Sequence, residues 1–275
     1  MTATAPQPVS TPAAPRRNPV VVALGRDALL GRAEPAQADV RRRNVAAAVE
    51  SIADLAADHD VVVAHGNELG GMIGYLLEQG LEAALPRREI ATVRMRGVVD
   101  ADELRTIRSL VAAGVLVICA GMPGVVESTE PPRGVEDVGD RDLAAALLAT
   151  CLGADALLML ADPDADAVQR DGGVPDARAP HTATPEELWR LPLAAGSMAP
   201  KVLAACRFVE ATGGMAAIGA LADARALLNG RCGTIVRASH DRQRSDREAA
   251  RDRLCLLPAV VARSIEGPPG GGLPA

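Results

Sequence analysis

Residues 115–119 read Val-Leu-Val-Ile-Cys, five consecutive apolar residues that end two positions before Gly121. A short apolar run bounded by a glycine predicts a strand that is buried on both faces of a sheet. The preceding residues, 101–113, have the apolar spacing of a helix. A helix that leads into such a strand is typical of a parallel sheet whose faces are covered by helices.

The same alternation continues in both directions along the chain. Further strands are predicted at 20–24, 61–64, 156–160, 215–218 and 234–236, with a weaker candidate at 90–93. Further helices are predicted at 40–57, 72–84, 140–151, 197–210 and 221–228. Apolar strands that alternate with helices predict an α/β fold, namely a three-layer α/β/α sandwich with an open, mainly parallel sheet.

The composition excludes several classes of protein. The 275 residues are 48% apolar, 23% charged and 1% aromatic, with a formal net charge of −6. The negative charge and the scarcity of aromatic side chains argue against a nucleic-acid partner. No apolar run reaches the roughly 18 residues of a membrane span, so we expect no membrane partner. Five scattered cysteines without a CxxC pair predict free thiols in a reducing cytoplasm, with no protein metal site and no disulfides.

Three segments differ in composition. Residues 1–17 are rich in Ala, Thr and Pro, which predicts a disordered tail. The alternating pattern occupies residues 18–238, which we expect to form one domain. Residues 239–275 are dense first in charge and then in Gly and Pro, which predicts a C-terminal extension.

Glycine and polar residues follow several of the predicted strands. They are Gly25, Arg26 and Asp27, then His65, Gly66 and Asn67, then Gly121, and finally Asp162. Because ligands of parallel α/β sheets bind at the carboxyl ends of the strands, this edge predicts the site of an enzyme. For His65 a structural role beside a glycine turn is favoured over catalysis, since no GxSxG or comparable nucleophile motif accompanies it.

The loops lack the common nucleotide-binding fingerprints, because neither GxxxxGK[ST] nor GxGxxG follows the first strand. Asp142 has two interpretations, as an acid that caps a helix or as a carboxylate that orients a cation. Asp162 begins an Asp-x-Asp-x-Asp run without the rest of an EF-hand. A contact with a nucleotide or with magnesium and a solvated turn are both open for that aspartate.

Lys201 is the only lysine among 29 basic residues. It ends the segment GSMAPK at 196–201, in which Ser197 can cap a helix whose first turn contains the lysine. A cation in that position opposes the helix dipole. This placement favours a role in binding an anion such as phosphate, for which the compact ammonium and the guanidinium fork are not interchangeable.

Together these segments resemble the carbamate kinases, which have the amino-acid-kinase fold. The segments are VVALGRDALL at 21–30, HGN at 65–67, GMIGYLLEQ at 71–79, DRDLA at 140–144, GSMAPKVLAACRFVEA at 196–211 and GT at 233–234. The resemblance covers roughly residues 19–238, and GMIGYLLEQ and GSMAPK are its most specific segments.

The resemblance implies reversible phosphoryl transfer between ATP and carbamate, giving ADP and carbamoyl phosphate, with Mg²⁺. It also implies a homodimer and a place in arginine metabolism. By position, Lys201 would contact the transferring phosphoryl group and Asp142 would orient the catalytic cations, with Arg141 in place of the family's lysine. Asp162, Ser197 and Met198 fall with Lys201 on the nucleotide side. Gly25, Arg26, Asp27, Gly66, Asn67 and Gly121 fall on the carbamoyl side.

The carbamoyl side departs further from the family than the nucleotide side. The family's GGN is Gly25-Arg26-Asp27 here, and the family's insertion after Asp100 is nearly absent. We therefore expect a divergent, carbamate kinase-like phosphotransferase. The alternatives are a kinase of another small acid, with Arg26 as a substrate clamp, and a catalytically impaired nucleotide-binding paralogue.

Overall fold

The computed structural model describes residues 18–25, 28–29, 38–66, 71–95, 101–122, 141–161, 182–190 and 198–239. The strands are β1 (Val20–Leu24), β2 (Val61–His65), β3 (Ile90–Arg94), β4 (Leu116–Ala120), β5 (Ala156–Ala161), β6 (Thr182–Ala183), β7 (Met215–Ala220) and β8 (Thr234–Arg237). The helices are α2 (Ala38–Ala56), α3 (Met72–Ala84), α4 (Ala101–Ala112), α5 (Arg141–Leu152), α6 (Pro185–Leu188), α7 (Met198–Thr212), the 3₁₀ turn η2 (Leu221–Asp223) and α8 (Ala224–Leu228).

The described strands form one sheet in the order β3-β4-β2-β1-β5-β7-β8-β6. Its first six strands pair in parallel, as the apolar runs predict. Strand β8 pairs antiparallel with β7, and β6 pairs parallel with β8, so these two strands run opposite to the rest. The prediction of an open, mainly parallel sheet is confirmed.

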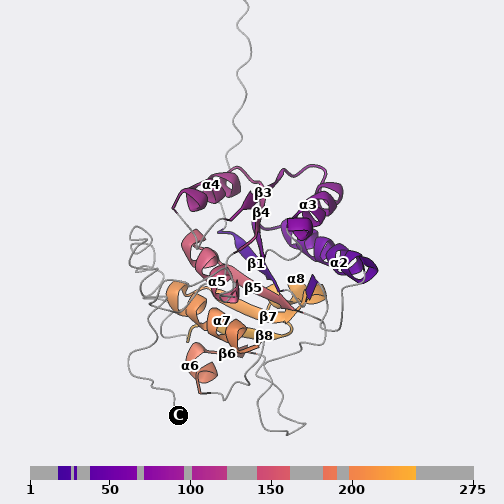
Figure 1. The fold of residues 1–275 in the computed structure, drawn as a ribbon. Coiled ribbons are helices and arrows are strands. Elements are labelled where there is room, and N and C mark those ends of the chain that lie inside the picture. The colour runs from indigo at the N-terminus through magenta and orange to yellow at the C-terminus, as the bar shows by residue number, and fades with distance from the viewer. Residues whose placement is uncertain are drawn as a thin grey trace, which may run out of the picture.

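Helices cover both faces of the sheet, which confirms the three-layer sandwich (Figure 1). Along β1, Val20, Val22 and Leu24 belong to a core shared with α2, α3 and α8. The alternate residues Val21 and Ala23 belong to a second core shared with α4, α5 and α7. Every residue of β1 is buried because each face of the strand meets a helix layer, and this explains the unbroken apolar run.

Two small elements were not predicted from the sequence. Strand β6 has only two residues, too few for a periodic pattern. Helix α6 does carry a readable start signal, since Thr184 and Glu187 form a capping box with Pro185 at the first helical turn. The helix predicted at 221–228 is a 3₁₀ turn followed by the short helix α8.

Arginine side chains terminate helices in this fold. The Arg88 guanidinium donates to the carbonyls of Ala56 and His59 at the end of α2. Arg225 donates to the Asp54 carbonyl in the last turns of α2, and Arg108 donates to the Cys151 carbonyl at the end of α5. A guanidinium, with its several N–H donors, is well suited to bind carbonyl groups at the end of a helix. Arginine therefore fills these structural roles, whereas the single lysine, Lys201, lies at the candidate site.

The buried cysteines are expected to be inert to thiol reagents in the native protein. Burial, with Glu103 nearby, raises the pKa of Cys119 to about 12, and burial, with Glu210 and Glu186 nearby, raises the pKa of Cys206 to about 12. At pH 8 only about one thiol in 10⁴ would then be the reactive thiolate. We therefore expect the variants Cys119→Ala and Cys206→Ala to show the same labelling by a chromogenic disulfide as the unmutated protein, and one label fewer after unfolding in urea. Loss of a native-state label in either variant would contradict this.

Candidate active site at the carboxyl ends of the strands

The carboxyl ends of the central strands lie at one edge of the sheet. In the strand register Leu24 is opposite His65 and Leu160, and His65 is opposite Ala120. The residues that follow these strands are therefore neighbours in space. Two backbone hydrogen bonds join them: Gly25 N–H donates to the Leu160 carbonyl at 3.2 Å, and Met122 N–H donates to the His65 carbonyl at 3.0 Å.

At the same edge, Lys201 and Asp142 form an ion pair. The Lys201 Nζ donates to Asp142 Oδ1 at 2.9 Å and to Oδ2 at 2.8 Å, across 59 residues of sequence. Only 10% of the lysine side chain and 17% of the aspartate side chain are exposed. The pair thus joins the first turns of α7 and α5 in a partly dry setting, where charge interactions are stronger than in water.

The two helices place opposite demands on these charges. Asp142 lies in the first turn of α5, where a negative charge is favoured by the helix dipole. Lys201 lies near the start of α7, whose first turn holds no acidic residue, so its charge is disfavoured there. Asp142 therefore supplies the negative charge that α7 itself lacks. The two helices pack against each other, and small residues such as Ala145 and Ala205 belong to the core that they share.

Gly25 lies against this ion pair. A Cβ atom at Gly25 would be 3.5 Å from Lys201 Nζ and 3.3 Å from the Leu160 carbonyl oxygen. The end of β1 and the starts of α5 and α7 therefore converge on one point. The sequence analysis assigned Gly25 to the carbamoyl side and Lys201 to the phosphoryl group and the nucleotide side, and the structure places these two residues next to each other.

The other predicted site residues divide into two groups. Arg141 is exposed, Met198 is partly buried at the start of α7, Gly66 is buried after β2, and Gly121 follows β4 with a φ of 76° that favours glycine. The remaining predicted residues lie outside the described ranges: they are Arg26, Asp27, Asn67, Asp162 and Ser197. The predicted tail, 1–17, and nearly all of the predicted extension, 239–275, lie outside them too.

His65 was treated from the sequence as a structural histidine, and it is indeed buried, with 2% of its surface exposed. It is also the last residue of β2, so it lies at the carboxyl edge beside Gly66 and close to the segment after β4. The signal in the sequence is its place directly after a buried apolar run.

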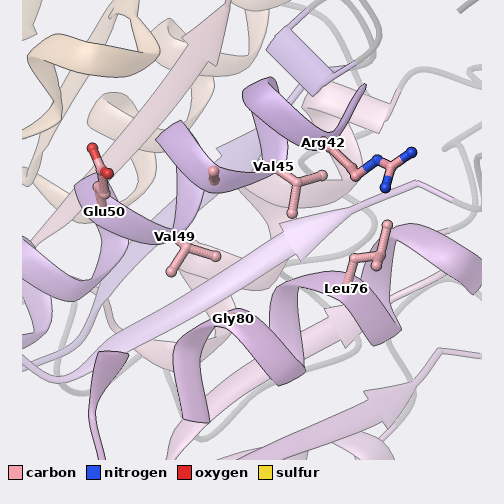
Figure 2. A pocket seen from close by; sticks show the side chains of 7 residues that line it. Arg42, Val45, Val49, Glu50, Leu76 and Gly80 are labelled. Carbon is pink, nitrogen blue, oxygen red and sulfur yellow. The ribbon is translucent and has the colours of Figure 1, made fainter. Parts of the chain in front are cut away.

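A groove of about 300 Å³ lies elsewhere, between α2 and α3. Figure 2 shows Val45 and Val49 of α2 on the side of Leu76 and Gly80 of α3, while Arg42 and Glu50 extend from α2 at the two ends of the groove. None of the predicted site residues lines it. Within the described ranges no cluster of three or more acidic, histidine or cysteine side chains could hold a metal ion, and no helix there is long and apolar enough to cross a bilayer.

The family follows from comparison with known proteins. Residues 85–218 match the model of the amino acid kinase family. The chain is 35% identical to the carbamate kinase of Rhizobium meliloti (strain 1021), over 80% of this chain and 93% of that relative. The chain belongs to the carbamate kinase family. It is also 34% identical to the carbamate kinase of Escherichia coli O157:H7, over 79% of this chain and 98% of that relative.

Solved carbamate kinases share the fold. The carbamate kinase from Giardia lamblia bound to AMP-PNP matches with a TM-score of 0.69 and 29% identity, over 81% of this chain and 99% of that chain. This member of the carbamate kinase family is therefore a carbamate kinase-like phosphotransferase. The alternatives, a kinase of another small acid and an impaired paralogue, are not favoured.

Proposed function

We propose that this carbamate kinase-like chain transfers a phosphoryl group reversibly between ATP and carbamate, giving ADP and carbamoyl phosphate. The observation that carries the proposal is the Lys201–Asp142 pair at the carboxyl edge, beside Gly25. Phosphoryl transfer needs positioned cations more than a covalent nucleophile. A buried ammonium at the edge where ligands of α/β sheets bind meets that need.

The geometry supports a separate role for each of Lys201, Asp142 and Gly25. An ammonium has three N–H donors, and two of those of Lys201 go to Asp142. Among the residues that the structure describes, the third donor has no acceptor, and we assign it to an oxygen of the transferring phosphoryl group. Asp142 holds the ammonium in place. The absence of a side chain at Gly25 leaves room beside Nζ for the phosphoryl oxygens.

The nucleotide side is proposed to include Met198 and Ser197, where α7 begins, and Asp162 after β5. Gly66, Asn67 and Gly121 are proposed for the carbamoyl side with Gly25, Arg26 and Asp27, and Arg141 is proposed to add positive charge near Asp142. Mg²⁺ bound with ATP or ADP would neutralise phosphate charge. Such ions are held largely by the phosphates themselves and by one or two carboxylates, for which Asp162 is the candidate.

The wider setting follows from the same chemistry. Carbamoyl phosphate production and use place the chain in arginine and carbamoyl-phosphate metabolism. A cytoplasmic location is proposed because Cys119, Cys151 and Cys206 are buried free thiols, which suits a reducing compartment. We also propose a homodimer, as the resemblance to carbamate kinases implies.

The direct test is ATP formation from MgADP and carbamoyl phosphate by the purified full-length chain, measured with a coupled assay. We expect ATP formation that depends on both substrates and that is lost in Lys201→Ala. ADP binding without ATP formation, even at high carbamoyl phosphate, would contradict the proposed reaction.

The altered loop after β1 is expected to limit carbamoyl phosphate use. Arg26→Gly combined with Asp27→Asn restores the family's GGN sequence and removes a bulky side chain and a negative charge from beside an anion. We expect kcat/KM for carbamoyl phosphate to rise about 30-fold, since the two removed obstacles correspond to roughly 1 kcal/mol of binding each. Steady-state kinetics at saturating MgADP measures this, and an unchanged kcat/KM would show that the loop does not limit the reaction.

A further inference from the structure

His65 makes contacts that connect several segments of the active-site edge. Its ring is buried between the end of β2 and the start of α3. The Nδ1 atom lies 2.6 Å from the carbonyl oxygen of Gly66. A carbonyl oxygen only accepts, so Nδ1 must be the donor and carries a proton.

This hydrogen bond acts on the path of the chain. Because a peptide group is planar, fixing the Gly66 carbonyl fixes the whole peptide bond that leaves Gly66. Glycine is the residue with the widest choice of backbone conformation, so an external restraint matters most there. The imidazole therefore restrains the Gly66 carbonyl, directly after the end of β2.

Two further contacts join His65 to neighbouring segments. Its own carbonyl accepts the Met122 N–H at 3.0 Å, which ties the chain after β4 to the end of β2. On the other side, a Cβ atom at Gly74 would be 3.0 Å from Nε2 and 3.4 Å from Cε1. The first turn of α3 therefore rests directly on the ring, and a larger residue at 74 would require the imidazole to shift by a few tenths of an ångström.

We propose that His65 is a positioning residue for the carbamoyl side of the site: its imidazole holds Gly66, and its backbone carbonyl holds Met122, directly after Gly121. The inference rests on the proposed function. Lys201 and Asp142 come from α7 and α5, which pack on the opposite face of the sheet from α3. Because His65 contacts Gly66, a residue assigned to the carbamoyl side, we expect it to affect the binding of carbamoyl phosphate and not that of the nucleotide.

The test compares two amides at position 65. In His65→Asn the amide nitrogen falls near the place of Nδ1, whereas in His65→Gln it falls near that of Nε2. We expect His65→Gln to raise the KM for carbamoyl phosphate at least about tenfold, because a displacement of about 1 Å in a positioning group can cost far more than that. The KM for MgADP should stay within about twofold. His65→Asn should recover most of the loss.

A matched pair of glycine variants on α3 separates positioning from stability. In Gly74→Ala the added Cβ atom would be 3.0 Å from Nε2 of the imidazole. In Gly80→Ala the added Cβ atom would be only 2.6 Å from Cγ2 of Val49 in α2. Both variants should lower Tm. Only Gly74→Ala should raise the KM for carbamoyl phosphate, and Gly80→Ala should leave both KM values unchanged. This pair also serves if His65→Gln does not fold.

The outcomes separate the two proposals. If the unmutated protein forms ATP but His65→Asn is no better than His65→Gln, or if Gly74→Ala and Gly80→Ala behave alike, His65 is structural only and this inference fails alone. If the unmutated protein forms no ATP from MgADP and carbamoyl phosphate, the proposed function fails and takes the inference with it. A rise in KM for carbamoyl phosphate alone, reversed by asparagine, supports both.

Discussion

Lys201→Ala is expected to lower ATP formation from MgADP and carbamoyl phosphate by about 10³-fold or more, while the protein stays folded. Removing one positioned donor or cation from a site of this kind costs two to five powers of ten in rate, by the usual order of magnitude. Stability should change little, because the ammonium lies near the start of α7, where its charge is disfavoured. In this variant Asp142 keeps its favourable interaction with the dipole of α5. Coupled-assay kinetics and a thermal melt together check both parts.

The control for this prediction is Lys201→Arg, which keeps the charge. A guanidinium is larger than an ammonium and is planar, and only 10% of the lysine side chain is exposed. Because a single Cβ atom added at Gly25 would already be 3.5 Å from Nζ, there is little room for the fork, which would displace the end of β1 or leave Asp142. We therefore expect Lys201→Arg to be nearly as inactive as Lys201→Ala. Turnover close to the unmutated rate in either variant would show that Lys201 does not contact the transferring group.

Asp142→Asn, unlike Lys201→Ala, is expected to lower the stability of the protein as well as its turnover. It leaves the Lys201 ammonium mostly buried, without a counter-charge and at an unfavourable helix end. Removing one partner of a buried pair costs about 3 kcal/mol of unfolding free energy, and this pair keeps some exposure, so about 2 kcal/mol is expected. Turnover should fall by about 10²-fold or more, since the ammonium is no longer held in place. Urea unfolding and steady-state kinetics measure the two effects.

The comparison variants for Asp142→Asn are the double variant Lys201→Met with Asp142→Asn, and Asp54→Asn. The double variant removes the isolated charge and should regain part of the lost stability, which a double-mutant cycle measures. Asp54 pairs with Arg225 at the surface, with 55% of the aspartate side chain exposed, so its loss should cost under about 1 kcal/mol. Equal destabilisation by Asp142→Asn and Asp54→Asn would contradict the importance of burial for the Lys201–Asp142 pair.

Much of the candidate site could be predicted because its residues follow predictable strands. Gly25, Gly66 and Gly121 were predicted at the carboxyl edge, and the strand register places them there. Local apolar runs suffice for this, since strands that point the same way necessarily end at the same edge. The role of His65 could not be predicted in this way. It depends on α3 resting against the ring at Gly74, a contact between segments that local pattern does not encode.

Within the described part of the fold, strand β6 and the direction of strand β8 could not be predicted from the sequence. Strand β6 is two residues long, and β8 pairs antiparallel although its apolar composition resembles that of the parallel strands. Composition reports that a strand is buried, not the direction in which it runs. Direction is decided by the connection, and the short segment from β7 through α8 returns the chain alongside β7 as an antiparallel neighbour.

The sequence by itself determined the layered α/β architecture and the candidate cation. An unbroken apolar strand requires cover on both faces, and a single lysine among arginines at a helix start favours an anionic ligand. Only the tertiary structure decided that Lys201 is held by Asp142, 59 residues away, and that Gly25 lies beside them. The physical reason is that local periodicity fixes which face of each helix is buried, whereas the meeting of two helix starts depends on how α5 and α7 pack together on the sheet.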